Sequence, residues 1–545
     1  MKKKLFILPL IALSVVSVAV SCAPNTSEDS SHSQSTDFGP NDGRHHIADL
    51  KGGNYDEGLM IYDNPSTPTK PYSGGGLNGQ YKNAKDEELL YDYHMLGKNH
   101  YYNRLTYMQS TGDLNLLVIP VKFADYDKNA TESVRERIYN AYFGTEEETG
   151  YESVATYFEK SSYGALNING VVTDWYECDW GTNIYGFKET AQLANEAFDW
   201  YKTKYKDNGS KFDIDKDGYV DTICLIYNAP VYESNNDNLW AYCYWVQPNR
   251  PGTVDNPIPN TFFFASMSFM TPRDKERRDP IKIDTHTYIH ELGHTMGIDD
   301  YYSYERRVDD KHRDYRPGST GGFIMEDMNV GDHDPFTKLS YGWTKPTVVT
   351  GSTEITLSSF EESGEVLIFK PENSMNSPFD EYIAVDLYTP TGLNAQDSKY
   401  LVQPGYVKGP RVPGIRVWHV DARLLELGLL DNEPNKNRVT TIIDPGKFCY
   451  RLAMSNTATA DHGSPIPEFR KYKLLHLIQK GGVNTYEEGQ LMTKNDLFME
   501  GDTFSMDAYK NFFVNNGRFN SNKELNVSIK VKSINGNKAV LDITM

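Results

Sequence analysis

One stretch of the sequence, residues 283–302, constrains the fold more than any other. It reads IDTHTYIHELGHTMGIDDYY and contains His290, Glu291 and His294 in the order HExxH. On an α-helix, residues four apart lie about 40° apart around the axis and roughly 6 Å apart along it, so the two imidazoles point to the same side. Two imidazoles at this spacing can bind one metal ion, with the glutamate beside them. The stretch therefore predicts a helix that carries part of a metal site.

The residues around this motif predict how the helix begins and ends. Asp284 or Thr285 can cap its start. Gly297 suits the left-handed residue that ends a helix. Gly293 has no side chain, so another element can pack closely against the helix there. After the helix the chain is expected to turn back and bring Asp300 towards the two histidines.

A catalytic zinc ion needs a third protein ligand and one open position. Asp300 is the predicted third ligand, because it completes the pattern HExxHxxGxxD. Asp299 is adjacent, but its spacing suits the pattern less well. Glu305 or Glu326 would instead make a site of two histidines and one glutamate, which usually takes its glutamate from a separate helix, and neither residue lies in a convincing one. We interpret His286, one turn before the motif, as an ordinary residue of the helix start rather than a ligand.

The chemistry of such a site predicts a hydrolase. Zinc lowers the pKa of a bound water to near 7 and polarises a carbonyl group. Glu291 is then expected to take the water proton and pass it to the leaving amine, as a general base and then a general acid. The function expected from these residues is a zinc-dependent endopeptidase that hydrolyses extracellular proteins.

Length and charge limit the remaining possibilities. A chain of 545 residues is too long for one core, so two or three domains are expected. The formal net charge of −20 argues against nucleic acid or an anionic membrane surface as a partner. The expected partner is a protein or peptide substrate, and we expect a monomer. Beyond residue 22 the chain has four cysteines, too few for a disulfide framework and without metal-ligand spacing: Cys178, Cys224, Cys243 and Cys449.

The first residues have the pattern of a targeting segment. Residues 1–22 combine three lysines, an apolar run over residues 5–20 and a final Cys22, as in a lipoprotein signal peptide. Residues 19–22, AVSC, resemble a bacterial lipobox, whose cysteine is lipidated. This pattern predicts a protein anchored by lipid to the extracellular face of the bacterial cell membrane. Ordinary cleavage and secretion is the alternative.

The rest of the chain divides by composition. Residues 23–50 are polar and rich in Ser and Asp, which predicts a flexible tether. Residues 51–112 are either an N-terminal extension or a prosegment. Over residues 113–345 strands and helices alternate up to the HExxH helix, which predicts an α/β or α+β catalytic domain. Its clearest expected elements are apolar strands at 114–123 and 220–227, a strand pair at 166–176, and helices at 153–160 and 191–205.

From residue 346 to residue 545 the pattern becomes β-rich. Short apolar segments recur between turns, which predicts one or two antiparallel modules of the β-sandwich type. The last two segments are joined by Asn535-Gly536-Asn537, a hairpin signal. His419 and Asp421 alternate on one of these segments, and we interpret them as one face of a strand rather than a catalytic pair.

A second group of carboxylates predicts either a calcium site or a solvated acidic turn. The spacing DxDxDGxxD resembles the beginning of an EF-hand loop, with Gly218 at the bend. The twelfth position of such a loop should be a bidentate Glu, and here it is Cys224. The candidate calcium ligands are Asp213, Asp215, Asp217 and Asp221.

The segment HELGHTMGIDDYY resembles the zinc helix of the immune inhibitor A family of secreted bacterial metallopeptidases. Four more stretches resemble that family in the same order, so that the resemblance covers about residues 113–425. The resemblance implies a metzincin-like zinc peptidase domain over residues 113–345, with a methionine in a tight turn under the metal. The four stretches are residues 153–176, 212–221, 321–343 and 413–421.

Met325 fits that methionine best, and Met328 is the alternative. The sequence departs from the family pattern here, because Ile324 and Glu326 flank Met325 where an Asp and a small or apolar residue are expected. His333, near the same turn, could stabilise an oxyanion or contact substrate; a structural hydrogen bond is the other interpretation.

A different class of function stays open. The chain could be a non-catalytic surface adhesin or a glycan-binding lipoprotein built on a protease scaffold. The intact set of two histidines, Glu291 and Asp300 argues against this alternative, because an inactive scaffold has no need of Glu291.

Overall fold

The computed structural model describes residues 108–545, apart from twelve short stretches, and the backbone of three short strands before residue 108. The signal peptide with Cys22, the tether, most of residues 51–112, Asp299 and Glu305 lie outside the described residues. In the part that is described, no helix has the length and apolar character needed to cross a membrane. The stretches left out are residues 185, 232–238, 249–250, 273–279, 298–299, 304–316, 345, 372–379, 403–404, 423, 429–447 and 453–471.

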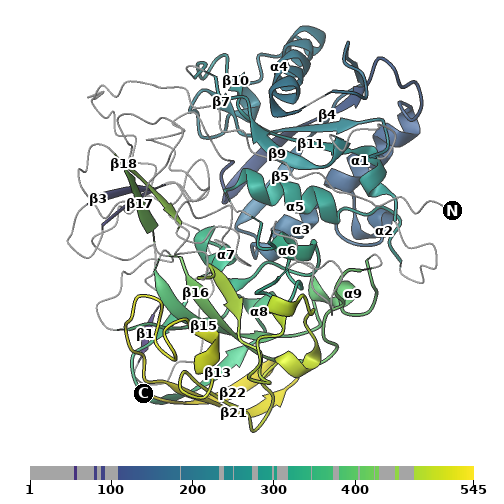
Figure 1. The fold of residues 1–545 in the computed structure, drawn as a ribbon. Helices are drawn as coiled ribbons and strands as arrows, with labels where there is room; N and C mark the ends of the chain where they lie inside the picture. The colour runs from purple at the N-terminus through teal and green to yellow at the C-terminus, as the bar shows by residue number, and fades with distance from the viewer. Residues whose placement is uncertain are drawn as a thin grey trace, which may run out of the picture.

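A mixed sheet forms the centre of the first half of the molecule (Figure 1). Its order is β5-β4-β8-β11-β9, and β6 also pairs with β4. Every strand pair is parallel except β11 with β9, so the sheet ends in an antiparallel strand. The two strands expected at 166–176 therefore each pair with β4. The strands are β4 (Gly112–Lys122), β5 (Leu166–Val172), β6 (Tyr176–Glu177), β8 (Ile223–Tyr227), β9 (Tyr242–Trp245) and β11 (Thr261–Ser266).

Helices cover both faces of this sheet, which explains why β4 is apolar at successive positions. Leu117 and Ile119 face a core shared with α4, whereas Leu116 and Val118 face a core shared with α1, α3 and α5. A strand buried on both faces has no reason to alternate polar and apolar residues. The predicted strand at 114–123 is confirmed. The helices are α1 (Glu132–Phe143), α3 (Val154–Ser161), α4 (Gly186–Tyr205) and α5 (His286–Thr295).

Two further sheets make up most of the C-terminal part. One has the order β1-β12-β14-β15-β16-β19 and the other β13-β22-β21-β20. A third sheet has the order β17-β18-β3-β2. The predicted hairpin is confirmed: β21 and β22 pair antiparallel, and Gly536 between them has a φ of 63°. The strands are β1 (Tyr55–Glu57), β12 (Thr347–Val349), β13 (Thr353–Ser358), β14 (Leu367–Phe369), β15 (Glu381–Tyr388), β16 (Gly414–Asp421), β19 (Leu475–Leu477), β20 (Thr503–Ser505), β21 (Ser528–Asn535) and β22 (Lys538–Thr544).

The sheet that contains β15 and β16 is buried on both faces. On one face, Val385 and Val417 pack with residues of β13, β21 and β22. On the other, Tyr382 and Trp418 belong to the same core as α3 and α5. That core crosses the boundary expected at residues 345 and 346. The two halves of the described chain are thus joined by a continuous hydrophobic interior.

Short elements complete the fold, and three of them, α6, α7 and α9, lie near α5 or the turn after it. The mixed α+β class with several sheets, one of them antiparallel and C-terminal, is confirmed at that level.

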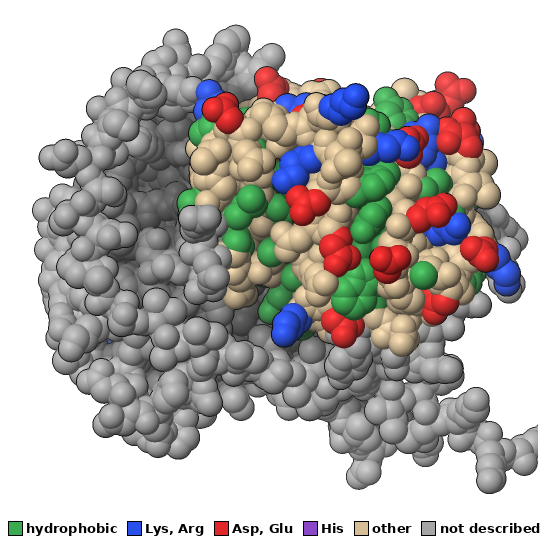
Figure 2. Space-filling view, turned by 90° about the horizontal axis from the view of Figure 1, so that it is seen from above, with side chains coloured by type: hydrophobic (Ala, Val, Ile, Leu, Met, Phe, Trp, Pro, Cys, Tyr) green, Lys and Arg blue, Asp and Glu red, His purple; other side chains and the backbone are tan. Residues whose placement is uncertain are grey.

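On the face shown in Figure 2, acidic and basic side chains of the described residues are interspersed. The remaining elements are α2 (Glu146–Thr149), α6 (Met325–Met328), α7 (Pro335–Ser340), α8 (Phe360–Ser363), α9 (Asn394–Asp397), β2 (Gly79–Lys82), β3 (Glu88–Tyr91), β7 (Tyr219–Val220), β10 (Ile258–Pro259), β17 (Leu424–Gly428) and β18 (Phe448–Leu452).

Candidate metal centre

Helix α5 holds the HExxH motif against the central sheet. Ile289 and Leu292 are fully buried in the core, and the Tyr288 hydroxyl donates to the Ser266 carbonyl at 2.8 Å. Asp284 accepts a hydrogen bond from the first helical N–H, at 3.3 Å. The helix ends at Thr295, and Gly297 then has a φ of 105°, as its predicted role in ending the helix requires.

The three predicted ligands meet at one point. The Nε2 atoms of His290 and His294 are 3.1 Å apart. Asp300 Oδ1 lies 3.1 Å from Nε2 of His290 and 3.3 Å from Nε2 of His294. Ligand atoms placed tetrahedrally around zinc at 2.0–2.1 Å are about 3.3 Å apart. These three atoms therefore have the separation that one shared zinc ion requires.

The first residue of α6 fixes which nitrogen of His290 faces this point. Its Nδ1 lies 3.0 Å from the Met325 carbonyl oxygen. A carbonyl oxygen only accepts hydrogen bonds, so in the neutral ring Nδ1 carries the proton and Nε2 is left with the lone pair that binds a metal. A metal-binding histidine is commonly oriented by such a bond from its other nitrogen. Met325, which is fully buried, thus contributes its backbone as well as its side chain to this region.

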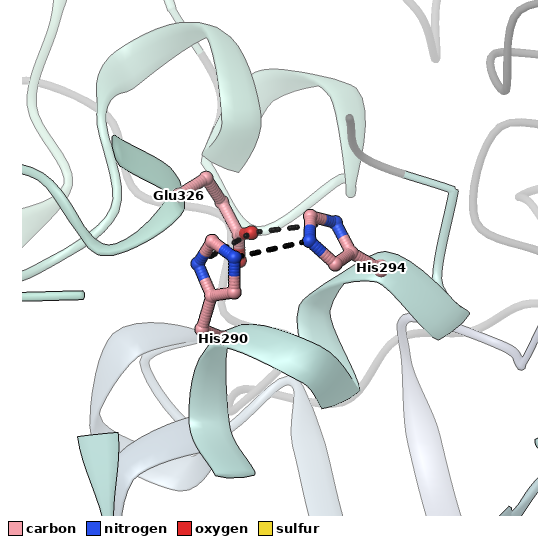
Figure 3. Close-up of side chains that lie close together, drawn as sticks. All are labelled: His290, His294 and Glu326. Atoms are coloured by element: carbon pink, nitrogen blue, oxygen red, sulfur yellow. Dashed lines mark hydrogen bonds and ion pairs between the residues drawn. The ribbon is translucent and has the colours of Figure 1, made fainter. Parts of the chain in front are cut away.

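A second carboxylate lies on the opposite side of the two rings. Glu326 is fully buried, and its Oε2 is 3.5 Å from Nδ1 of His290 and 3.6 Å from Nδ1 of His294 (Figure 3). His290, His294 and Glu326 form a group whose atoms are close enough to hold a metal ion. The expectation that Glu326 lies outside a helix is wrong, because it belongs to the short helix α6.

Gly293 makes room for that carboxylate. A Cβ atom on Gly293 would lie 2.0 Å from Glu326 Oε1, so the Glu326 side chain would have to move away. The expected close approach to Gly293 is therefore the approach of Glu326. Because Glu326 lies beside the Nδ1 atoms and Asp300 beside the Nε2 atoms, the geometry favours Asp300 as the third ligand. Glu326 is then a carboxylate that pairs with the Nδ1 side of both rings.

The charges in this group disfavour histidine rings that carry neither an extra proton nor a metal ion. Burial lowers the pKa of His290, but the Glu326 and Asp300 carboxylates outweigh it and raise that pKa to about 9. Burial likewise raises the pKa of Asp300, yet His294 and His290 hold it well below its usual range. Protons and a metal cation compete for the same nitrogens, so the excess of negative charge that holds protons here also attracts a cation.

Glu291 has the features of an acid–base group. It is buried, and within the described part of the chain its Oε2 has no hydrogen-bond partner. Burial raises the pKa of Glu291 to about 7, although His290 and His294 pull it downward. A carboxyl whose pKa lies near neutrality can both take up and release a proton at physiological pH.

His333 is committed to protein partners. Its Nδ1 lies 2.9 Å from the Ser161 hydroxyl and its Nε2 lies 3.3 Å from Glu326 Oε1. The ring is 1% exposed and packs edge-on against Trp343. Of the two roles considered for His333, this position favours the structural hydrogen bond over a contact with substrate.

His286 binds two carboxylates and stays apart from the metal group. Its Nδ1 is 2.8 Å from Asp284 Oδ1, and its Nε2 is 3.3 Å from Asp397 Oδ2. The Asp397 carboxylate also accepts from the Gly331 N–H at 2.7 Å. Burial alone would lower the pKa of His286, but Asp397 and Asp284 raise it to about 10. Asp397, on α9, thus ties the start of the HExxH helix to the loop after α6.

The ion pair of His286 and Asp397 predicts a stability change that depends on pH. Because the pKa of His286 is raised in the folded protein, the ionic stabilisation is fully present below about pH 6.5 and is lost as pH rises through about 10. Asp397→Asn should reduce the free energy of unfolding by about 3 kcal/mol near pH 6. The difference from wild type should shrink towards pH 10.5, as measured by urea titration. The exposed control Asp507→Asn should show neither effect, and a pH-independent difference for Asp397→Asn would contradict the assignment.

The acidic turn brings three of its four aspartates together. Oxygens of Asp213, Asp215 and Asp221 lie within 4.8 Å of one another. Asp217 lies outside this group, and its carboxylate accepts from the Tyr219 N–H at 2.8 Å. Burial is the main cause that raises the pKa of Asp213 to about 6, and the negative charge of Asp215 is the second. Cys224, in the twelfth position of the supposed loop, is buried in β8.

Neither a scan of protein-family models nor a search of curated proteins finds a match for this chain. The resemblance to the immune inhibitor A family therefore stays a prediction, and the geometry of the site carries the functional argument.

Two residues of the site region were not anticipated in these roles. Glu326 was considered only as an alternative ligand, and its position next to Met325 was the one available signal. Asp397 had no signal, because nothing in its neighbourhood resembles a motif and its partners lie far away in sequence.

Proposed function

We propose that this protein is a zinc-dependent endopeptidase with a metzincin-like catalytic domain and a C-terminal region of the β-sandwich type. The observation that carries the proposal is the triangle of His290 Nε2, His294 Nε2 and Asp300 Oδ1, with edges of 3.1–3.3 Å. The unpartnered, buried Oε2 of Glu291 next to this triangle supports it.

His290, His294 and Asp300 would hold the zinc ion. Bound zinc supplies a Lewis acid that polarises a carbonyl group and makes water a better nucleophile near neutral pH. Glu291 takes a proton from the attacking water and delivers it to the nitrogen of the leaving amine. Its burial serves this role, because it brings the pKa of the carboxyl to about 7. Glu326 and the Met325 carbonyl orient the His290 imidazole through its Nδ1 atom.

A peptide substrate is supported by the end of the central sheet. β9 is the last strand of the sheet in the described part of the chain, and it packs against α5. An extended peptide can add to the edge of a sheet through main-chain hydrogen bonds. A peptide bound in this way would run close to the HExxH helix. With the lipid anchor expected at Cys22, the substrates would be extracellular proteins.

Removal of zinc tests the proposal directly. The purified protein should contain one zinc ion per chain and hydrolyse casein. Treatment with 1,10-phenanthroline should abolish hydrolysis, and added zinc should restore it. A chain that binds zinc but cleaves no protein would favour the adhesin alternative. Hydrolysis that persists in protein shown to be free of metal would contradict the proposed chemistry.

We also propose calcium at the acidic turn of Asp213, Asp215 and Asp221. Calcium at a hundred times its dissociation constant should stabilise the fold by about 2.7 kcal/mol, seen as a rise in Tm. Asp213→Asn should remove that rise. Asp217→Asn is the matched control and should retain it, since Asp217 lies outside the group of three carboxylates. An equal loss in both variants would contradict the three-residue site.

A further inference from the structure

A second polar cavity lies in the C-terminal part, apart from the metal group. Strands β16 and β19 pair so that His419 is directly opposite His476. Next to this pair is a cavity of about 150 Å³. Phe512 and Phe513 form part of its wall, with ring centroids 5.3 Å from His476 and 4.9 Å from His419. Also in its lining are Lys473, Asn484, Glu487, Asn511, Val514 and Asn520.

Three polar atoms of this lining are buried and have no hydrogen-bond partner within 3.5 Å among the described residues. They are Nε2 of His476, Oδ1 of Asn484 and Oδ1 of Asn520. The side chains of His476 and Asn520 are more than nine-tenths buried, at 3% and 8% exposure. Buried polar atoms without partners are rare, because each loses its bonds to water. One ordered water takes only about 30 Å³, so this cavity has room for a larger molecule.

Hydrogen bonds to neighbouring carboxylates fix the side chains of Asn520 and His419 in place. The Asn520 amide nitrogen donates to Asp421 Oδ2 at 2.8 Å, which leaves its oxygen facing away from that bond. The Asn520 backbone N–H donates to Glu381, whose carboxylate also accepts from His419 Nε2 at 2.8 Å. The Asn520 acceptor is therefore held in place, and the charge of Glu381 is directed at protein donors.

The charges around the cavity select an uncharged partner. Burial lowers the pKa of His476 well below its usual range, and Lys473 and His419 lower it further, whereas a weak hydrogen bond to the Asn484 side chain raises it. The ammonium group of Lys473 lies in the same lining, so a further ammonium group is disfavoured there. The carbonyl oxygens of Asn484 and Asn520 repel an anion. Lys473 and Glu487 form an ion pair with each other at the rim.

We propose that this cavity binds one unit of a neutral, hydroxyl-rich ligand, namely a sugar residue of a glycan. Hydroxyl groups can donate to the carbonyl oxygens of Asn484 and Asn520 and bond to Nε2 of the neutral His476. The aromatic rings of Phe512 and Phe513 offer an apolar wall, as binding pockets with a few fixed polar groups commonly do. The site is independent of the metal centre and of the proposed peptidase activity.

The test is saturation-transfer NMR on the full chain with three separate probes: methyl glucoside, methyl galactoside and N-acetylglucosamine. At least one probe should bind saturably. Asn484→Ala should weaken that binding about tenfold, the effect of one lost hydrogen bond. His476→Phe, which fills the cavity, should abolish it. The exposed Asn495→Ala is the matched control and should bind as wild type does.

The outcomes separate the alternatives. Saturable binding that both cavity variants lose supports the proposal. No saturable binding of any of the three sugars would overturn it, as would binding that Asn484→Ala leaves unchanged. Binding of methylammonium in place of the sugars would also overturn it. If His476→Phe fails to fold, Asn484→Ala still provides the test, because Asn484 is only half-buried.

Discussion

Glu291→Gln is expected to reduce casein hydrolysis by about 10²–10⁴-fold while the protein keeps its zinc. The amide has nearly the same size as the carboxyl, so the fold and the three predicted ligands should be undisturbed. What is lost is a group that can accept and return a proton, which Glu291 can do because burial raises its pKa to about 7. The measurements are the hydrolysis rate and the zinc content of the same preparation.

Two comparisons make this result specific. Glu147→Gln changes an exposed carboxyl on α2 and should leave both rate and zinc content unaltered. A Glu291→Gln protein that retains its zinc and hydrolyses casein at the wild-type rate would remove Glu291 from the mechanism. A protein that loses its zinc as well would show that Glu291 acts in metal binding instead.

Asp300 and Glu326 should differ in their effect on zinc affinity. Asp300→Ala removes an oxygen that lies 3.1–3.3 Å from both Nε2 atoms, and should weaken zinc binding by more than about 100-fold. Glu326→Gln alters a carboxylate beside the Nδ1 atoms, and should weaken it by about 10–100-fold, the usual effect of a residue that supports a ligand. Competition with a chromogenic chelator measures both dissociation constants.

The order of these two effects decides the third ligand. A greater loss in Glu326→Gln than in Asp300→Ala would make the centre a two-histidine, one-glutamate site. Asp127→Asn, at a side chain that is 91% exposed, is the surface control and should bind zinc as wild type does.

The sequence allowed the elements with strong local signals to be predicted. The apolar run of β4 and the Asn-Gly turn between β21 and β22 need only neighbouring residues to be recognised, and both are confirmed. The meeting of His290, His294 and Asp300 could also be anticipated, since the helix sets one distance and Gly297 the turn that follows. These features follow from backbone geometry over at most a few turns of chain.

The contacts that surround the site could not be predicted, because they join distant segments. Nothing near Asp397 shows that its carboxylate reaches both His286 and Gly331. Glu326 departs from the expected pattern at its position, and its role depends on the absence of a side chain at Gly293. The cavity next to His476 depends on strand pairing between β16 and β19, which no local pattern specifies.

The sheet that is buried on both faces also sets an order of events during synthesis. The N-terminal parts of a chain leave the ribosome and begin to fold first. The HExxH helix, however, lies against a core that includes Trp418 and Leu475, and its first turn pairs with Asp397. Its full set of contacts therefore exists only after most of the chain has been made. If the site is the proposed hydrolytic centre, its late completion leaves it little chance to act on the nascent chain that carries it.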